Sequence, residues 1–367
     1  MKAIFNSVYQ WLDARLDVGE ALAFAKKKTV PVHKHSFWYY WGGISLLLFL
    51  VQAFTGVLLM VYYRPGPEAF ESVRQITFEY NFGWLIRSVH SWAANLMVAA
   101  VLVHMFSVYF MKAYRQPREF GWWSGLGLLG LAMVFGFSGY LLPMNELAYF
   151  ATKVGMETAA MLPVVGSKLA DLARGGLEIN EFTVQRFFAL HVVVLPALFL
   201  PLLGLHLWLV QKHGNAVPPS EEVKPASERK SIPFFPNFMA KDLAVWLITL
   251  NILAVIAFMF PWELGKPADS LASAPADIHP EWYFMSSFQI LKIFGSLLPG
   301  KSFGTLGEFV GMGFFNVGLV LWALVPLYDG NSKSGVRARN ATYFGLAVLL
   351  VVVVTTIWGY VALPKVG

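Results

Sequence analysis

Seven apolar runs constrain this chain more than any other feature of its sequence. They fall near residues 37–62, 84–111, 122–142, 187–211, 242–262, 306–328 and 341–363, and each is long enough to cross about 30 Å of hydrocarbon as a helix. Only 14% of the 367 residues are charged, against about 25% in soluble domains. The sequence therefore predicts an all-α, polytopic membrane protein with seven transmembrane helices.

The basic residues are sorted by membrane side. Of the 28 Lys and Arg residues, 17 lie on the side of the N-terminus, so the positive-inside rule predicts that residues 1–36 form a cytoplasmic segment. No cleavable signal peptide is apparent in that segment. The sorting also accounts for the net charge of +6, so we expect a lipid bilayer as the surrounding medium and no nucleic-acid partner.

The connections between the runs divide the chain into units. Residues 214–240 are polar and rich in proline, and we interpret them as a cytoplasmic linker between a four-helix unit (37–213) and a three-helix unit (241–367). The connection 143–186 has apolar residues at helical spacing in 154–162 and 169–172, which predicts short surface helices. Pro196 and Pro201 predict a kink in the fourth span.

Four histidines lie in two of the predicted spans. His90 and His104 are 14 residues apart, and His191 and His206 are 15 apart. Each pair therefore lies near one face of its helix, about 21 and 22 Å apart along the axis. If the helices are antiparallel neighbours, His90 faces His191 at the outer side and His104 faces His206 at the inner side. Two stacked pairs of imidazoles inside a bilayer predict two b-type haems.

Glycines repeat the spacing of these histidines. Gly42 and Gly56 are 14 residues apart in the first run, and so are Gly125 and Gly139 in the third. A flat macrocycle between helices needs places where no side chain projects, and glycine supplies them. Close helix packing would explain any single glycine but does not predict a spacing matched to the histidines. We therefore expect these glycines to line the haem sites.

Two arginines lie near the outer ends of the histidine-bearing runs. Arg87 precedes His90 by three residues, and Arg186 precedes His191 by five. Both are candidate partners for haem propionates, and each would serve equally as an interfacial cation. The chain has no cysteine, which excludes a thioether-linked haem and iron–sulfur ligation by this chain. The expected haems are therefore non-covalent.

Several motifs identify a resemblance to a known family. The segments are FGWLIRSVH (82–90), GYLLP (139–143), TVQRFFALH (183–191) and PEWY (280–283). Together with the histidine pairs, they resemble the cytochrome b subunit of quinol:cytochrome c oxidoreductases over about residues 36–300. The 15-residue step, the polar break and the seven spans resemble the photosynthetic branch, in which a short cytochrome b and a three-helix subunit are separate. Here the two pieces look fused.

The resemblance implies a function. Quinol is oxidised at the outer face, and one electron passes to a Rieske iron–sulfur protein or a c-type cytochrome subunit. The other electron crosses through the two b haems to a quinone site on the cytoplasmic side, which couples the reaction to proton translocation. The resemblance also implies a homodimer in the bacterial cytoplasmic membrane.

The resemblance assigns site residues as well. Glu281 is expected to accept a quinol proton, because desolvation raises the pKa of a carboxyl group toward neutrality. Tyr283 is expected to hydrogen-bond the quinol, or to cap its pocket as an interfacial aromatic residue. The other residues that match quinol-pocket positions of the family are Phe137, Tyr140, Leu147 and Pro280.

The inner quinone site rests on Lys241 and Asp242. They match a Lys-Asp pair that serves quinone binding in respiratory members, although an acidic residue at a helix start is also favoured by the helix dipole. Photosynthetic members carry a cysteine close before the first Gly-Gly, where it anchors an extra haem. This chain has Trp41 before Gly42-Gly43, so an additional haem is not expected through such a link.

Two other function classes are compatible with the sequence. One is a di-haem conduit that passes quinol electrons to multihaem c-type cytochromes without a Rieske partner. The other is a seven-helix transporter or receptor with structural histidines, which predicts a colourless protein. The PEWY motif favours quinol oxidation with two electron acceptors, because a simple conduit needs no second pocket at the outer face.

Overall fold

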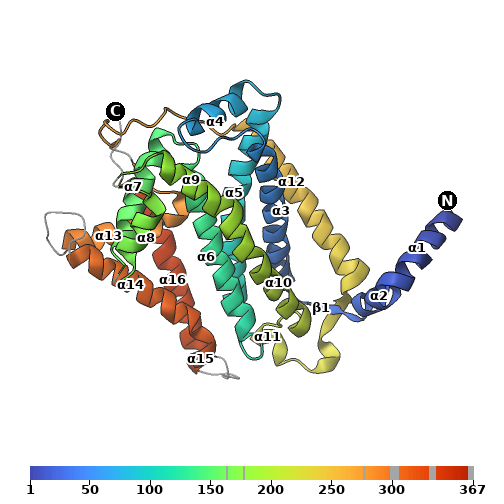
Figure 1. The fold of residues 1–367 in the computed structure, drawn as a ribbon. Coiled ribbons are helices and arrows are strands. Elements are labelled where there is room, and N and C mark those ends of the chain that lie inside the picture. Colours follow the sequence, from blue (N-terminus) through green and yellow to red (C-terminus); the bar gives the residue numbers. More distant parts are fainter. Residues whose placement is uncertain (163, 177, 276–277, 298–305, 330–335, 363–367) are drawn as a thin grey trace.

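The computed structural model is a helical bundle with one short strand pair (Figure 1), and it describes residues 1–367 except 163, 177, 276–277, 298–305, 330–335 and 363–367. Seven of its helical segments are long and apolar enough to cross a membrane, which confirms the predicted polytopic all-α fold. These segments are Ser36–Met60, Gly83–Phe110, Glu119–Leu141, Glu181–His213, Phe234–Met259, Leu306–Ala323 and Arg339–Val361.

The element boundaries follow the order of the chain. The first half contains α1 (Lys2–Leu16), α2 (Val18–Lys27), β1 (Thr29–Val32), α3 (Tyr40–Met60), α4 (Ala69–Phe78), α5 (Gly83–Phe110), α6 (Glu119–Leu141), α7 (Glu146–Ala160), α8 (Gly166–Arg174) and α9 (Glu181–Ala189). The second half contains α10 (Leu195–His213), α11 (Pro219–Glu222), β2 (Lys230–Pro233), α12 (Met239–Met259), α13 (Trp282–Leu297), α14 (Leu306–Ala323), α15 (Val325–Asp329) and α16 (Val336–Val361).

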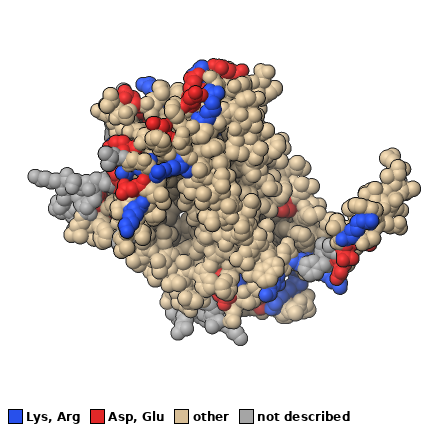
Figure 2. All heavy atoms as spheres, viewed as in Figure 1, with Lys and Arg blue, Asp and Glu red and all other residues tan. Residues whose placement is uncertain are grey.

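The centre of the bundle is built from helix pairs. Helix α3 packs along α5, and α6 packs along α10. Their shared core contains small residues, such as Ala93, Ala100 and Ala132, beside Leu48 and Leu253. Small side chains let helix backbones approach closely in a membrane, where lipid removes the usual hydrophobic drive for association. On the face drawn in Figure 2, charged side chains gather near the upper and lower edges and leave the middle largely uncharged.

An aromatic and ionic cluster joins the three-helix unit to the four-helix unit. Tyr109 of α5 stacks on Trp322 of α14 with ring centroids 3.9 Å apart. Beside them, Tyr114 donates a hydrogen bond of 2.6 Å to Asp329, and Arg115 forms a 3.0 Å ion pair with the same carboxylate. Asp329 is only 1% exposed, so the pair is an internal contact between the two units.

The fourth span departs from a regular α-helix just before Pro196, while the predicted kink stays a prediction. Residues Leu190–Val194 form a π-helical turn between α9 and α10, in which the N–H of Leu195 donates to the carbonyl of Leu190. Pro196 has no N–H to continue the α-helical pattern, and single π turns are the usual local adjustment. His191 lies in this turn.

The connections contain the expected helices and one strand pair. Helices α7 and α8 occupy the connection 143–186, which confirms the predicted short helices. Within the predicted linker, β2 pairs antiparallel with β1, which lies some two hundred residues earlier. In Figure 1, α4 and α9 lie at one end of the bundle, β1 and α11 lie at the other, and α1 projects away from it.

Candidate functional site

The four histidines come together in the two predicted pairs. His90 interacts electrostatically with His191, and His104 with His206, so α5 and the fourth span present their histidines to each other. Each pair lies within the membrane-crossing part of the bundle. We call the two ends of the bundle the His90 side and the His104 side.

Each of the four predicted glycines lies against one of these imidazoles. A Cβ atom built on Gly56 would lie 3.4 Å from Cε1 of His90, and one on Gly139 would lie 2.8 Å from Cε1 of His191. On the other side, a Cβ on Gly42 would lie 3.1 Å from Cε1 of His104. Gly125 approaches His206 in the same way, at 3.2 Å. The glycines therefore leave room for the histidine rings themselves, in addition to any room they leave for a macrocycle.

Three of the histidines have a hydroxyl partner at Nδ1. The hydroxyls belong to Thr55, at 2.8 Å from His90, Ser138, at 3.0 Å from His191, and Ser124, at 2.9 Å from His206. In each case the hydroxyl residue directly precedes the glycine that contacts the same histidine. These three residues were not predicted from the sequence, although a hydroxyl residue directly precedes the glycine at three of the four positions.

The hydroxyl bonds determine which ring nitrogen is left for a metal. Thr55 Oγ1 donates to the carbonyl of Val51 at 2.7 Å, and Ser124 and Ser138 donate to carbonyls three residues earlier. Each hydroxyl oxygen is therefore free to accept the Nδ1–H of its histidine. This arrangement leaves Nε2 unprotonated, which is the form that binds haem iron.

His104 is the exception. Its Nδ1 is buried and has no hydrogen-bond partner among the described residues. The residue before its glycine is Trp41, whose Nε1 is likewise buried without a partner in the described part of the chain. The environment of this histidine therefore differs from that of the other three, and the two histidine pairs are not equivalent.

These residues fit a pair of six-coordinate b haems. Paired imidazoles, fixed tautomers and glycines at the contact points are what axial ligation requires. The two predicted propionate partners have other contacts. Arg87 donates to the carbonyls of Trp262 and Glu263 at 2.7 and 2.8 Å, and Arg186 donates to the carbonyl of Leu172. Their propionate role stays a prediction, and in the structure both arginines hold connecting segments.

The PEWY segment packs against the end of α6. A Cβ on Gly136 would lie 2.9 Å from Cζ of Tyr283, so this tyrosine fills the space that the glycine leaves open. Glu281 interacts electrostatically with Tyr140, Tyr283 and Tyr360. The structure thus brings the predicted proton acceptor next to two of the predicted pocket residues.

The surroundings of Glu281 favour its neutral form. Burial raises the pKa of the Glu281 carboxyl, and the nearby His279 opposes this only in part. Burial also raises the pKa of Tyr283, with a further contribution from the Glu281 charge. Pro280 accepts a 2.9 Å hydrogen bond from His279 Nδ1 through its carbonyl. A carboxyl group with a raised pKa is suited to proton exchange near neutral pH.

The other pocket residues differ in burial. Phe137 packs edge to face against Phe187 and Phe284, with ring centroids 5.8 and 6.3 Å apart, so it joins the α6 end to α13. Leu147 is 43% exposed, and its part in a quinol pocket stays a prediction.

The predicted inner quinone residues lie at the start of α12, on the His104 side. A Cβ on Gly43 would lie 2.7 Å from Oδ1 of Asp242. Gly43 follows Gly42, which contacts His104. Asp242 and His104 therefore lie against two adjacent glycines of α3.

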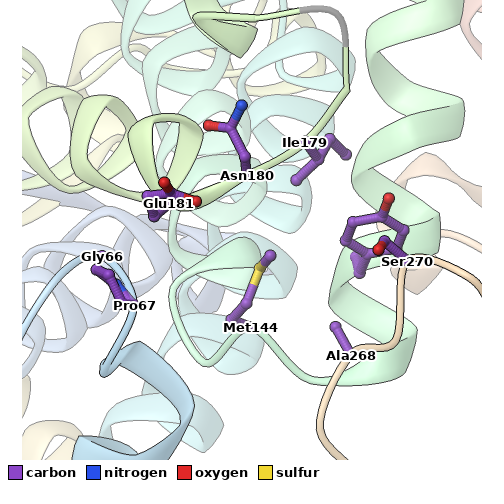
Figure 3. A pocket seen from close by; sticks show the side chains of 9 residues that line it. Gly66, Pro67, Met144, Ile179, Asn180, Glu181, Ala268 and Ser270 are labelled. Atoms are coloured by element: carbon purple, nitrogen blue, oxygen red, sulfur yellow. The ribbon is translucent and has the colours of Figure 1, made fainter.

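A separate cavity of about 270 Å³ opens near the turn between α6 and α7 (Figure 3). Its walls come from residues 66–67, Met144, 179–181 and the segment after α12, represented by Ala268 and Ser270. Asn180 in its rim caps α9 by accepting from the N–H groups of Phe182 and Thr183. None of Glu281, Tyr140, Tyr283 and Tyr360 is among the residues that line this cavity.

Comparison with known proteins identifies the family. A family model described as Cytochrome b(N-terminal)/b6/petB matches residues 95–267, and one described as Cytochrome b(C-terminal)/b6/petD matches residues 267–365. A cytochrome bc complex cytochrome b subunit from Chlorobaculum thiosulfatiphilum is 44% identical over 354 residues, which cover 96% of this chain and 80% of that protein. The chain belongs to the cytochrome b family. Its N-terminal and C-terminal parts are joined in one polypeptide, as the resemblance implied.

Further relatives agree with this assignment. Cytochrome b6 of Heliobacterium mobile is 42% identical over 210 residues, which cover 57% of this chain and 99% of that protein. A solved structure titled Hyperthermophilic respiratory Complex III superposes with a TM-score of 0.82 at 28% identity and covers 97% of this chain and 92% of that chain. Membership of the cytochrome b family implies b-type haem as the cofactor of this membrane protein.

Proposed function

We propose that this chain is the cytochrome b subunit of a proton-translocating quinol:cytochrome c oxidoreductase. Two non-covalent b haems, one between His90 and His191 and one between His104 and His206, would supply one-electron carriers across the bilayer. The buried pairs, their hydroxyl partners and the family assignment support this proposal. The ordered imidazoles would hold the two carriers about 20 Å apart along α5.

The observation that carries the proposal is the position of Glu281. Its carboxyl lies beside Tyr140 and Tyr283, and Tyr140 follows Gly139, which contacts His191. A quinol bound here would lie beside a proton acceptor. It would also lie at the end of α6 that is near His90 and His191. Glu281 would accept the hydroxyl proton, the two tyrosines would orient the quinol ring, and Phe137 would supply an apolar wall.

The opposite end of the bundle would bind quinone. Asp242 lies against Gly43 beside the His104 contact, so its carboxyl is placed to give a proton to a quinone reduced there. Lys241 would add positive charge at the same helix start. Protons would then leave on the Glu281 side and enter on the Asp242 side, which charges the membrane.

The remaining parts of the proposal concern partners and location. The electron acceptor on the Glu281 side would be a Rieske iron–sulfur protein, a c-type cytochrome subunit or both, and the complex would be a homodimer. The distribution of basic residues supports a cytoplasmic N-terminus, and the membrane would be a bacterial cytoplasmic membrane.

The test is quinol oxidation by the Glu281→Gln variant of the purified complex. We expect the rate to fall by about 10²–10⁴-fold, the usual contribution of a positioned proton acceptor, with the haem spectrum unchanged. Glu178→Gln is the control, because Glu178 forms an exposed pair with Lys153 and should leave the rate as in the wild type. Normal turnover of Glu281→Gln would favour the di-haem conduit instead.

A further inference from the structure

A large cavity lies along α5, mostly on the side that faces away from the histidines. It has a volume of about 1210 Å³ and is lined by Leu102, Phe106 and Phe110 of α5 and by Val352 and Val353 of α16. An α-helix turns about 100° per residue, so Phe106 lies about 160° around α5 from His104. None of the four histidines lines the cavity, and its volume exceeds the roughly 300–1,000 Å³ of ordinary small-molecule pockets.

The cavity has a cationic end and an apolar end. Lys112 and Arg115, just beyond the end of α5, and Arg339, in the first turn of α16, line it on the His104 side. From the end of α5 at Phe110 the cavity continues along the helix as far as Ala99, a distance of about 17 Å at 1.5 Å per residue. This is close to the depth of one leaflet of a bilayer whose core is about 30 Å thick.

Lys112 is the residue that points to a ligand. It is 7% exposed, and its Nζ is buried without a hydrogen-bond partner among the residues that the structure describes. Burial lowers the pKa of Lys112 to about 8, against a partial opposing effect of Asp329. The nearest aromatic rings, Tyr109 and Tyr114, have centroids 5.2 and 5.7 Å from Nζ. A buried ammonium group is costly unless an anion pairs with it.

The nearby acidic charge does not complete the site. Asp329 pairs with Arg115 and accepts from Tyr114. Arg339 adds a further positive charge from the start of α16, and no Asp or Glu is among the described residues that line the cavity. A phosphate group would offer several acceptor oxygens to these cations.

We propose that this cavity binds one anionic phospholipid, with its phosphate at Lys112, Arg115 and Arg339 and its acyl chains along the groove between α5 and α16. Basic pockets between membrane helices are suited to anionic lipid headgroups. The apolar length beyond the cations argues for a lipid over a free phosphate ion. Trp282 of the PEWY segment lines one end of the cavity, but Glu281, Tyr283 and the four histidines do not line it, so the proposal does not rest on the proposed function.

The test compares lipid retention by the purified full chain in its complex. Samples are exchanged into mixed micelles of phosphatidylglycerol and phosphatidylcholine in equal amounts, and bound lipid is counted by native mass spectrometry. We expect wild-type protein to retain one phosphatidylglycerol per chain in preference to phosphatidylcholine. Lys112→Met should lower this preference about fivefold, as expected for one cation near a headgroup, whereas Lys153→Met, on an exposed pair elsewhere, should not change it.

Inorganic phosphate and a second variant provide further tests of the proposal. Inorganic phosphate should neither raise the melting temperature of delipidated protein nor displace the bound lipid. The haem spectrum reports whether Lys112→Met folds, and if it does not, Arg339→Gln takes its place with the same expected loss. Equal retention of the two lipids by the wild type, or an unchanged preference in the folded variants, would overturn the proposal.

Discussion

The contact between Gly139 and His191 gives a quantitative prediction. A Cβ at position 139 would lie 2.8 Å from Cε1 of His191, whereas one at position 56 would lie 3.4 Å from Cε1 of His90. Both glycines therefore approach histidines that we propose as ligands of the same haem, at different distances. We expect Gly139→Ala to weaken the free energy of haem binding at this site by about 1–3 kcal/mol through overpacking, which corresponds to about a 5- to 150-fold loss of affinity for that haem.

The controls come from the same bundle. Gly56→Ala needs little movement of His90, and a Cβ on Gly130 of α6 would meet no atom within 4 Å. Both changes should keep both haems and gain about 0.5–1 kcal/mol from the better helix propensity of alanine. The assay is the ratio of haem to protein by pyridine haemochrome, together with the melting temperature. The reasoning fails if Gly139→Ala retains as much haem as Gly56→Ala and Gly130→Ala.

Three other predictions follow from single contacts. Ser138→Ala removes the hydroxyl group that lies at Nδ1 of His191. The midpoint potential of one haem should then shift by about 40 mV, which is equivalent to a hydrogen bond of about 1 kcal/mol. A redox titration identical to that of the wild type would contradict this role of Ser138. Asp329→Asn should destabilise the protein by about 3–5 kcal/mol in thermal unfolding, because Arg115 would lose a buried partner; a melting temperature like that of the wild type would count against it. Burial raises the pKa of Glu281, so the rate of quinol oxidation should increase as pH rises through that pKa and the carboxyl loses its proton. Glu281→Gln should abolish this pH dependence. If the pH dependence persists in the variant, another group is responsible for it.

The features that depend on regular helix geometry were predictable from the sequence. Seven apolar runs of sufficient length predicted the spans, and the 14- and 15-residue spacings predicted which histidines pair. The prolines of the fourth span predicted its irregularity, which the structure places at Leu190–Val194. These properties require only local periodicity and a fixed rise per residue.

The features that depend on contacts between distant segments were not predictable. The β1–β2 pairing joins Thr29 to Pro233, and neither strand has a pattern that specifies its partner. The terminal nitrogens of Arg87 bind the backbone after α12, and nothing in its sequence position showed the course of that segment. The hydroxyl of Thr55 became a histidine partner only once the packing of α3 against α5 was known.

The central claim is that two b haems are bound by His90 with His191 and by His104 with His206. The most direct measurement is the haem content and reduced-minus-oxidised spectrum of the purified chain, with single alanine variants of His90 and His104. We predict two b haems per chain in the wild type and one in each variant, with different haems lost. Fewer than two haems in the wild type, or loss of the same haem in both variants, would contradict the account.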